Sequence, residues 1–379
     1  MHEFNKSISF LREHFTGLED PRGARGRMHP FFSVLTIAIL AAICGADEWT
    51  EVEEYGKSKV SFLSQFLDLP YGVPSHDTFG RVFSQIDPEQ FGACFSAWTA
   101  RMADTFGEIV NIDGKQLRGS YDTEDEKAAI YMVSAWANEH NMVLGQVKVD
   151  DKSNEITAIP KLLSILKLEG ALITIDAMGT QQKIAAQIQN AQADYLLALK
   201  GNQAETHQQV VEAFELFEAG KKTKMHQELD MGHGRIEKRT CFVAPARDWL
   251  LEENYLKWKG VKTLVKVHTE VEQRNGKQKG QVTQETRYYL SSLEPDAENI
   301  NQAVRSHWGI ETKMHWVLDV AFREDQSRVR KENAPENFAI LRHIALNKLK
   351  NEKSVKRGIK GKRKKAGWDD EYLLKVLLT

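Results

Sequence analysis

The spacing of apolar and polar positions divides the chain into a helical part and a part that alternates between strands and helices. Residues 1–105 carry apolar side chains at helical spacing, which predicts an α-helical N-terminal domain. The apolar run 31–46 contains Ser33 and Thr36 and is only 16 residues long. Since a membrane span needs roughly 20 residues, we expect a buried helix here and no membrane partner.

Near residue 107 the pattern changes to short apolar runs that are typical of strands. The predicted strands are residues 108–112, 130–137, 142–149, 171–175 and 195–199, and the predicted helices between them are residues 155–168 and 181–191. The order β-β-β-α-β-α-β indicates an α/β fold. A helix that connects two strands returns the chain in the same direction, so the strand at 171–175 should run parallel to the strand at 108–112.

The remainder of the chain is expected to interrupt and then complete this fold. Residues 205–295 contain one helix followed by strand-like stretches, with a turn at Asn275-Gly276, and are predicted to form a β-rich insertion. A helical pattern resumes at Asn299 and continues, with breaks, to Lys350. The expected domains are residues 1–105, a core made of 106–204 and 296–350, the insertion 205–295, and a basic C-terminal tail, 351–379.

Composition excludes several classes of protein. Of 379 residues, 41% are hydrophobic and 27% are charged, which is the balance of a water-soluble globular protein rather than a collagen-like, low-complexity or membrane-embedded one. The three cysteines (Cys44, Cys94 and Cys241) are odd in number and far apart. They cannot supply a disulfide framework or a cysteine-based zinc site, so a reducing, cytoplasmic location is expected.

The net charge of −2 hides a basic cluster near the C-terminus. Residues 350–365 hold nine Lys or Arg and one acid, so the cluster carries +8 and the rest of the chain −10. Such a run is typical of a nucleic-acid contact, because each neutralised phosphate releases counterions. A solvated tail that contacts nothing is the alternative. The cations that we single out are Lys362, Arg363, Lys364 and Lys365.

Two aspartates each follow an apolar strand. Asp113 follows residues 109–112 and Asp176 follows residues 172–175. If these strands are parallel neighbours, both carboxylates emerge at the edge of the sheet where open α/β sheets place their sites. A turn residue or a helix cap is the ordinary alternative for each one. Adjacent carboxylates repel unless a cation lies between them, and oxygen ligands favour Mg²⁺ or Mn²⁺.

A third carboxylate is available on the late helical segment. His307, Glu311 and His315 recur every four residues and are therefore expected to share a helical face. Two divalent ions held by three carboxylates can activate the attacking oxygen and stabilise the leaving oxygen in an in-line phosphoryl displacement. Glu311 is the candidate third carboxylate on this segment, and Asp319 falls near the same face.

Several motifs resemble the DDE transposases of the ISAs type, the group that includes the H-repeat-associated proteins. The N-terminal region also resembles the transposase-associated domain of that group. The matching core segments are NIDGKQLRGS (111–120), KSNEI (152–156), TIDAMGTQ (174–181), YLLALKGNQ (195–203), HWGIE (307–311) and HWVLDV (315–320), and the N-terminal ones are DPR (20–22), GAD (45–47) and PSHDTF (74–79). The resemblance extends from about residue 18 to 350 and excludes the basic tail.

The resemblance implies an insertion-sequence transposase with an RNase H-like core, built on a mixed five-stranded sheet with helices. It implies that Asp113, Asp176 and Glu311 bind Mg²⁺ or Mn²⁺, as two ions, and that double-stranded DNA at the element ends and at the target is the partner. A homo-oligomer in the DNA complex and a nucleoid-associated location follow. Related transposases often carry an arginine where this chain has His307, so this residue is expected either to contact phosphate or to pack the helix. They commonly carry a lysine where this chain has Leu318, so no cation is expected at that position.

Further candidates for DNA contact lie near the acidic positions in sequence. Lys115 and Arg118 follow the first aspartate, with a solvated loop charge as the alternative. Lys200, Asn202 and Gln203 leave the last core strand toward the same edge. His307 and His315 complete the set. His315 could orient a ligand or a DNA phosphate, although a packed helix histidine is the commoner case.

Two rival functions remain at this stage. A catalytically silent or domesticated transposase would bind DNA without cutting it, independently of Mg²⁺. A zinc metallohydrolase would use His307, Glu311 and His315 as ligands. The eight-residue spacing of these histidines disfavours it, because the HExxH motif places its two histidines four residues apart.

Overall fold

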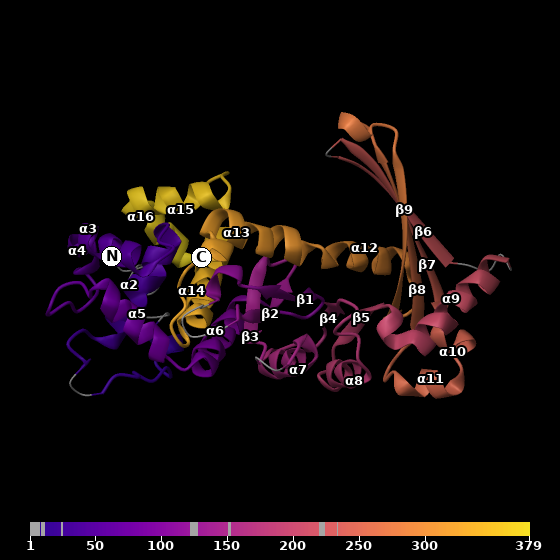
Figure 1. Cartoon of the computed structure of the whole chain (residues 1–379), viewed down its shortest axis with the longest axis horizontal. Coiled ribbons are helices and arrows are strands. Elements are labelled where there is room, and N and C mark those ends of the chain that lie inside the picture. Colours follow the sequence, from indigo (N-terminus) through magenta and orange to yellow (C-terminus); the bar gives the residue numbers. More distant parts are fainter. Residues whose placement is uncertain are drawn as a thin grey trace.

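The computed structural model contains one mixed sheet of nine strands, in the order β3-β2-β1-β4-β5-β9-β8-β7-β6 (Figure 1). The structure describes Ile8 and residues 12–23, 26–121, 128–150, 153–219, 224–232 and 234–379. Lys152, the first residue of one family motif, lies outside the described residues. The strands are β1 (Ile109–Gln116), β2 (Tyr131–Ala137), β3 (Met142–Lys148), β4 (Leu172–Ile175), β5 (Asp194–Leu199), β6 (Lys224–Gly232), β7 (Arg235–Pro245), β8 (Thr263–Gln273) and β9 (Val282–Ser291).

Helices cover both faces of this sheet and form a separate group at the N-terminal end. The helices before β6 are α2 (Phe31–Cys44), α3 (Trp49–Ser58), α4 (Val60–Leu63), α5 (His76–Gln85), α6 (Pro88–Met102), α7 (Glu155–Ile165), α8 (Gln182–Asn190) and α9 (Ala204–Ala219). The later ones are α10 (Ala246–Trp249), α11 (Glu252–Lys257), α12 (Ala297–His307), the π turn η5 (Glu311–His315), α13 (Trp316–Phe322), α14 (Ala334–Asn351), α15 (Ile359–Trp368) and α16 (Asp370–Leu378).

The register of β1 explains where the predicted edge lies. β1 pairs in parallel with β4 up to Ile112 and Ile175, but its antiparallel pairing with β2 continues to Gln116. Asp176 therefore follows its strand as expected. The prediction that Asp113 also follows its strand is wrong, because β2 keeps β1 extended beyond the end of β4.

The two faces of the sheet carry different helices. In Figure 1, α7 and α8 lie below the core strands and α12 crosses above them. Successive side chains of β5 point to opposite faces of the sheet. Leu197 packs into the apolar cluster with α7 and α8, and Leu196 packs into the cluster with α12. The core thus has three layers, with β1 and β4 held between helices.

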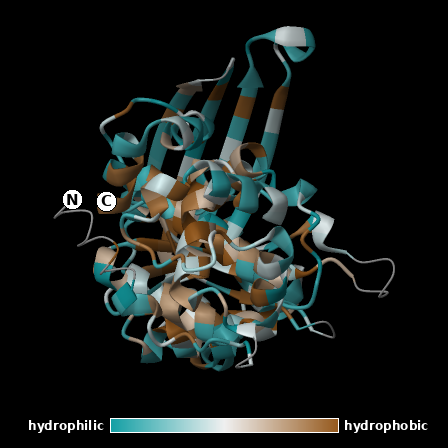
Figure 2. Ribbon diagram, turned by 90° about the vertical axis from the view of Figure 1, so that its left-hand side faces the viewer, coloured by the Kyte–Doolittle hydropathy of each residue, from teal (hydrophilic) through white to brown (hydrophobic). Residues whose placement is uncertain are grey.

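The β-rich insertion extends the core sheet. β9 pairs antiparallel with β5, and β8, β7 and β6 follow it, so the five core strands form part of a larger sheet. The outer part of this insertion is mostly hydrophilic (Figure 2). The apolar pattern predicted strands at β7, β8 and β9 but missed β6, because Lys224–Gly232 is polar and largely exposed.

The N-terminal helices pack around α2. Its residues from Ser33 to Ile43 are all buried, and α14 and α15 contact it. Within the described ranges no single helix has the length and apolar content to cross a membrane, and α2 with α3, bent by 96°, passes that test only as a pair. α2 is the buried helix that the sequence predicted.

The predicted basic tail is wrong, because residues 359–378 form α15 and α16, which pack against the N-terminal helices (Figure 1). Arg363 is 3% exposed and donates to the carbonyls of Ala42 and Ala46, at 2.9 and 3.1 Å, and to Asp47 at 2.8 Å. Lys362, which is 6% exposed, donates to the carbonyl of Leu349 at 3.0 Å. Both cations satisfy helix C-terminal carbonyls, so neither is available to a DNA phosphate.

Candidate functional site

Asp113 and Asp176 lie at the same edge of the sheet, where the parallel ladder of β1 and β4 ends. The carboxylate of Asp176 accepts hydrogen bonds from the backbone N–H groups of Met178 at 3.0 Å and Gly179 at 3.2 Å. Both aspartates line one cleft of about 610 Å³, together with Glu311. The structure therefore brings together the three carboxylates that the sequence predicted.

Glu311 and His315 reach Asp113 from the π turn between α12 and α13. Nδ1 of His315 lies 3.1 Å from Oε2 of Glu311 and 3.6 Å from Oδ2 of Asp113. Ligand atoms of these three residues all lie within 4.8 Å of one another, close enough to share one metal ion. A π turn is rare and occurs frequently at functional sites, and here it brings a carboxylate and an imidazole close to Asp113 on β1.

His307 lines the same cleft as Glu311, but its ring is buried against β4. Its Nδ1 lies 2.8 Å from Oγ1 of Thr174 on β4. Burial lowers the pKa of His307 to about 4, so the ring is neutral at pH 7. Asn111 on β1 donates to the carbonyls of Ser306 at 2.6 Å and His307 at 3.2 Å. These contacts fix the end of α12 on the sheet, which assigns a packing role to His307.

Gly309 lets the chain pass close to the β2–β3 hairpin just before Glu311. A Cβ at this position would lie 2.5 Å from Oδ1 of Asn138, closer than real Cβ contacts come. That same oxygen accepts from Lys313 at 3.1 Å. The close approach explains the glycine in the HWGIE motif.

In the described part of the chain, no Lys or Arg forms an ion pair with the acidic cluster of Asp113, Asp176 and Glu311, although Lys200 and Arg287 line the same cleft. Burial raises the pKa of Asp113 to about 7, and the neighbouring carboxylates of Glu155, Asp176 and Glu311 add to that increase. Lys115 is two residues away but lies against Asp319, against Glu324 at 2.9 Å and against Asp325 at 3.7 Å. Adjacent carboxylates without a basic partner are the donor set of a divalent cation.

His315 contacts this cluster with a buried, neutral ring. It is 4% exposed, and burial lowers its pKa despite the nearby Glu311 carboxylate. Its Nε2 has no hydrogen-bond partner among the described residues. His315 therefore supports Glu311 from the protein interior. A side chain that contacts DNA directly would face the solvent, and His315 does not.

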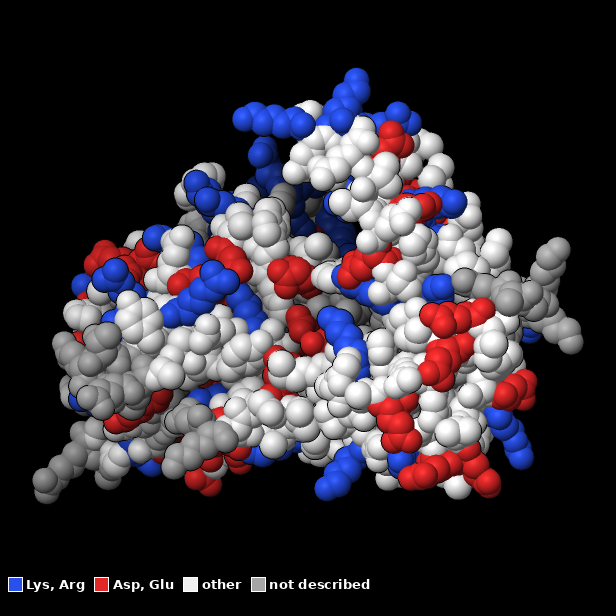
Figure 3. Space-filling model, turned by 45° about the vertical axis from the view of Figure 1, so that its right-hand side comes forward, with Lys and Arg blue, Asp and Glu red and all other residues white. Residues whose placement is uncertain are grey.

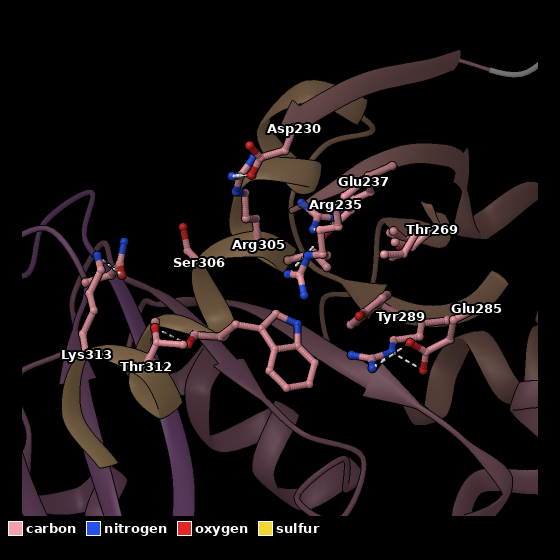
Figure 4. Close-up of a pocket in the computed structure, with 18 residues that line it drawn as sticks. Asp230, Arg235, Glu237, Thr269, Glu285, Tyr289, Arg305, Ser306, Thr312 and Lys313 are labelled. Atoms are coloured by element: carbon pink, nitrogen blue, oxygen red, sulfur yellow. Dashed lines mark hydrogen bonds and ion pairs between the residues drawn. The ribbon is translucent and has the colours of Figure 1, made fainter. Parts of the chain in front are cut away.

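A second cleft of about 690 Å³ adjoins the first (Figure 4). Arg287, Tyr289 and Trp308 line both clefts. Arg235, Glu237 and Thr269 of the insertion face Ser306 and Thr312 across the second one (Figure 4). In Figure 3, acidic and basic side chains both lie around the central hollow, and further basic side chains gather at the top of the molecule. The two clefts form a continuous groove from the acids to the insertion.

Arg287 and Trp308 mark the junction of the two clefts. The guanidinium carbon of Arg287 lies 4.7 Å from the centre of the Trp308 ring, and the tryptophan is 47% exposed. The sequence analysis did not single out Arg287. Its polar neighbours in β9 give no sequence signal, because Trp308, which it contacts, comes from the end of α12.

The other candidate residues have distinct positions. Asn202 donates to the carbonyl of Ala177 at 2.6 Å, and Gln203 donates to that of Thr180 at 3.0 Å. Both therefore support the loop that follows Asp176. Lys200 is exposed and lines the first cleft, and the side chain of Arg118 is 77% exposed. Lys364 is exposed on α15, and Lys365 pairs with Asp369 at 2.7 Å.

Comparisons with known proteins identify the family to which the chain is similar. Residues 103–348 match the family model of a transposase DDE domain, and residues 12–99 match a domain associated with it. The first span includes Asp113, Asp176 and Glu311.

Full-length relatives and a solved structure were also found. The chain is 40% identical over 372 residues to "H repeat-associated putative transposase YhhI" of Escherichia coli (strain K12), covering 97% of each. It is 41% identical over 375 residues to "Putative transposase YncI" of Escherichia coli O157:H7, covering 98% of this chain and 95% of the relative. A piggyBac transposase synaptic complex with hairpin DNA aligns over 96% of this chain and 77% of its own, with a TM-score of 0.41 and 11% identity.

Proposed function

Because the chain belongs to the family of insertion-sequence transposases with a DDE domain, we propose that it cleaves and rejoins DNA strands with Asp113, Asp176 and Glu311. The observation that carries the proposal is that Asp113 and Asp176, at the ends of parallel pairing, share a cleft with Glu311. We assign the strands β1 to β5 and their helices to an RNase H-like core.

The donor set fits Mg²⁺ or Mn²⁺. Carboxylate oxygens are the ligands that these ions prefer, and the carboxylates of Asp113, Asp176 and Glu311 are the proposed ligands for two ions. When bound, the ions would supply an activated oxygen nucleophile and charge stabilisation at the phosphate. His315 holds Glu311 in place, and Asn202 and Gln203 hold the loop after Asp176.

The proposed DNA path is the groove between the core and the insertion. Lys200, Arg287 and Trp308 lie along it, beside the acids. The cations would position phosphates near the carboxylates, since phosphate contacts fix register and orientation. Exposed cations of α15, such as Lys364, are proposed as further phosphate contacts. A homo-oligomer is expected in the complex, because two element ends must be paired.

The test is cleavage of labelled double-stranded DNA that carries the ends of the element. The wild type is compared with Asp113→Ala, Asp176→Ala and Glu311→Ala in Mg²⁺, Mn²⁺ and EDTA. We expect metal-dependent nicking at the ends that each substitution abolishes, with DNA binding retained. Binding without any nicking by the wild type would instead favour a silent, DNA-binding transposase, and stoichiometric zinc by metal analysis would favour the metallohydrolase.

A further inference from the structure

Glu155, the first residue of α7, is a buried carboxylate at the edge of the sheet where Asp113 lies. It is 7% exposed, although α7 is otherwise an ordinary helix that packs under β2 and β3. Asn154 caps the helix by accepting from the N–H of Ile156 at 3.1 Å. The cap is thus already supplied, and the burial of Glu155 needs another explanation.

Gly114 provides the space that the Glu155 carboxylate occupies. A Cβ on Gly114 would lie 2.2 Å from Oε1 and 2.6 Å from the carboxyl carbon of Glu155, and 2.5 Å from the Tyr131 ring. Gly114 directly follows Asp113 on β1. Any side chain at position 114 would therefore displace the Glu155 carboxylate from its place against β1.

Glu155 is also electrostatically part of the acidic cluster. Burial raises its pKa, the Tyr131 hydroxyl opposes that increase by hydrogen bonding to it, and Asp176 adds to it. The carboxylates of Glu155, Asp176 and Glu311 all raise the pKa of Asp113. In the part of the chain that the structure describes, no Lys or Arg is among the leading influences on either carboxyl group.

We propose that Glu155 is a fourth carboxylate of the metal site, oriented by the hydroxyl of Tyr131 on the neighbouring strand β2. This inference rests on the proposed metal-dependent function of Asp113, Asp176 and Glu311. Glu155 approaches from α7, whereas Glu311 approaches from the segment after α12, so the carboxylates come from both helical layers. The four carboxylates repel one another in the metal-free protein, and a divalent cation between them removes that repulsion.

The test is direct Mn²⁺ binding to the full-length chain without DNA, followed by the EPR signal of free Mn²⁺. Glu155→Gln keeps the shape of the side chain and removes its charge. We expect its Kd for Mn²⁺ to rise at least tenfold, in the range found when groups around a metal are altered. We also expect its melting temperature in EDTA to rise above that of the wild type, because one repelling charge is gone.

Glu108→Gln is the matched control. Glu108 is a buried glutamate that precedes the opposite end of β1, where it accepts from the N–H of Glu139 at 2.7 Å. This variant should bind Mn²⁺ as the wild type does. Tyr131→Phe keeps the charge of Glu155 but removes the orienting hydroxyl, and we expect its Kd to rise severalfold.

If a folded Glu155→Gln variant binds Mn²⁺ with the affinity of the wild type, the inference is overturned. If the melting temperature of that variant is also lowered, the role of Glu155 is purely structural. If Glu155→Gln fails to fold, Tyr131→Phe decides, and unchanged affinity there overturns the inference. If Asp113→Asn also leaves Mn²⁺ binding unchanged, the metal site itself is wrong. If only Glu155→Gln is without effect, the proposed function stands without Glu155.

Discussion

Glu311 and His315 face each other across a single π turn, with Oε2 of the glutamate 3.1 Å from Nδ1 of the histidine. The same ring nitrogen lies 3.6 Å from Asp113. The histidine is buried and the glutamate is exposed. The buried ring therefore holds the carboxylate of Glu311, a proposed metal ligand, close to Asp113.

This relationship predicts that His315→Ala slows Mg²⁺-dependent nicking by about 10–100-fold, the usual effect of removing a group that orients a metal ligand. Binding of the same DNA in EDTA should be unchanged. His140→Ala is the matched control, since His140 also contacts a glutamate, Glu108, but at the opposite end of β1. Equal nicking rates for His315→Ala and His140→Ala would contradict the supporting role.

The raised pKa of Asp113 predicts how the metal-free protein responds to pH. Burial and neighbouring carboxylates hold this pKa at about 7, whereas an aspartate in an unfolded chain titrates near ~3.9. Between these values the folded state binds more protons than the unfolded state, so the contribution of Asp113 makes stability fall as pH rises. In EDTA, the stability gain of Asp113→Asn over wild type should grow from pH 4 to pH 7 and level off above.

The measurement for this prediction is thermal unfolding of both proteins across that pH range. Saturating Mn²⁺ should reverse the order at pH 8, because only the wild type retains the ligand. A difference between the two proteins that does not vary with pH would contradict the assignment.

Arg363 and Lys364 are adjacent in sequence, but substitutions at the two positions should have opposite consequences. Removing the buried Arg363 leaves Asp47 and the end of α2 without their donor, so Arg363→Ala should lower the free energy of unfolding by about 3–5 kcal/mol. Lys364→Ala should change it by less than about 0.5 kcal/mol and should reduce DNA affinity instead. Urea unfolding and DNA titration of the two variants separate these outcomes. Equal stabilities would contradict the placement of α15.

Arg287 should contribute one phosphate contact in the groove. We expect Arg287→Ala to weaken DNA binding and to reduce the slope of log K against log salt by about 0.9, the value for one phosphate on duplex DNA. Arg287 pairs with Glu285 at 2.8 Å. Lys161→Ala is the control, because Lys161 likewise pairs with an acid, Asp150, but lies on α7 outside the groove. An unchanged slope in Arg287→Ala would place the DNA elsewhere.

Much of the core could be predicted from the sequence because its signals are local. Apolar runs of four to eight residues predicted β2, β4 and β5 to within about a residue, and the helix between the first hairpin and β4 implied parallel strands. β6 was missed, since it is an edge strand whose polar residues are stabilised by pairing with β7 rather than by burial. The nine-stranded sheet could not be predicted, because the pairing of β9 with β5 joins residues almost a hundred positions apart.

For the candidate site, too, some features could be predicted from the sequence and others only from the tertiary structure. The sequence alone singled out Asp113, Asp176 and Glu311, since each stands in a motif and carries the oxygen ligands that phosphoryl transfer requires. Only the tertiary structure turned His307 toward Thr174, placed Glu155 beside Gly114 and buried Arg363 under α2. A motif states which chemical groups are present, whereas burial and partners depend on contacts between segments distant in sequence. Those contacts, and not the residue types, decide which charged side chains are available to a metal ion or to DNA.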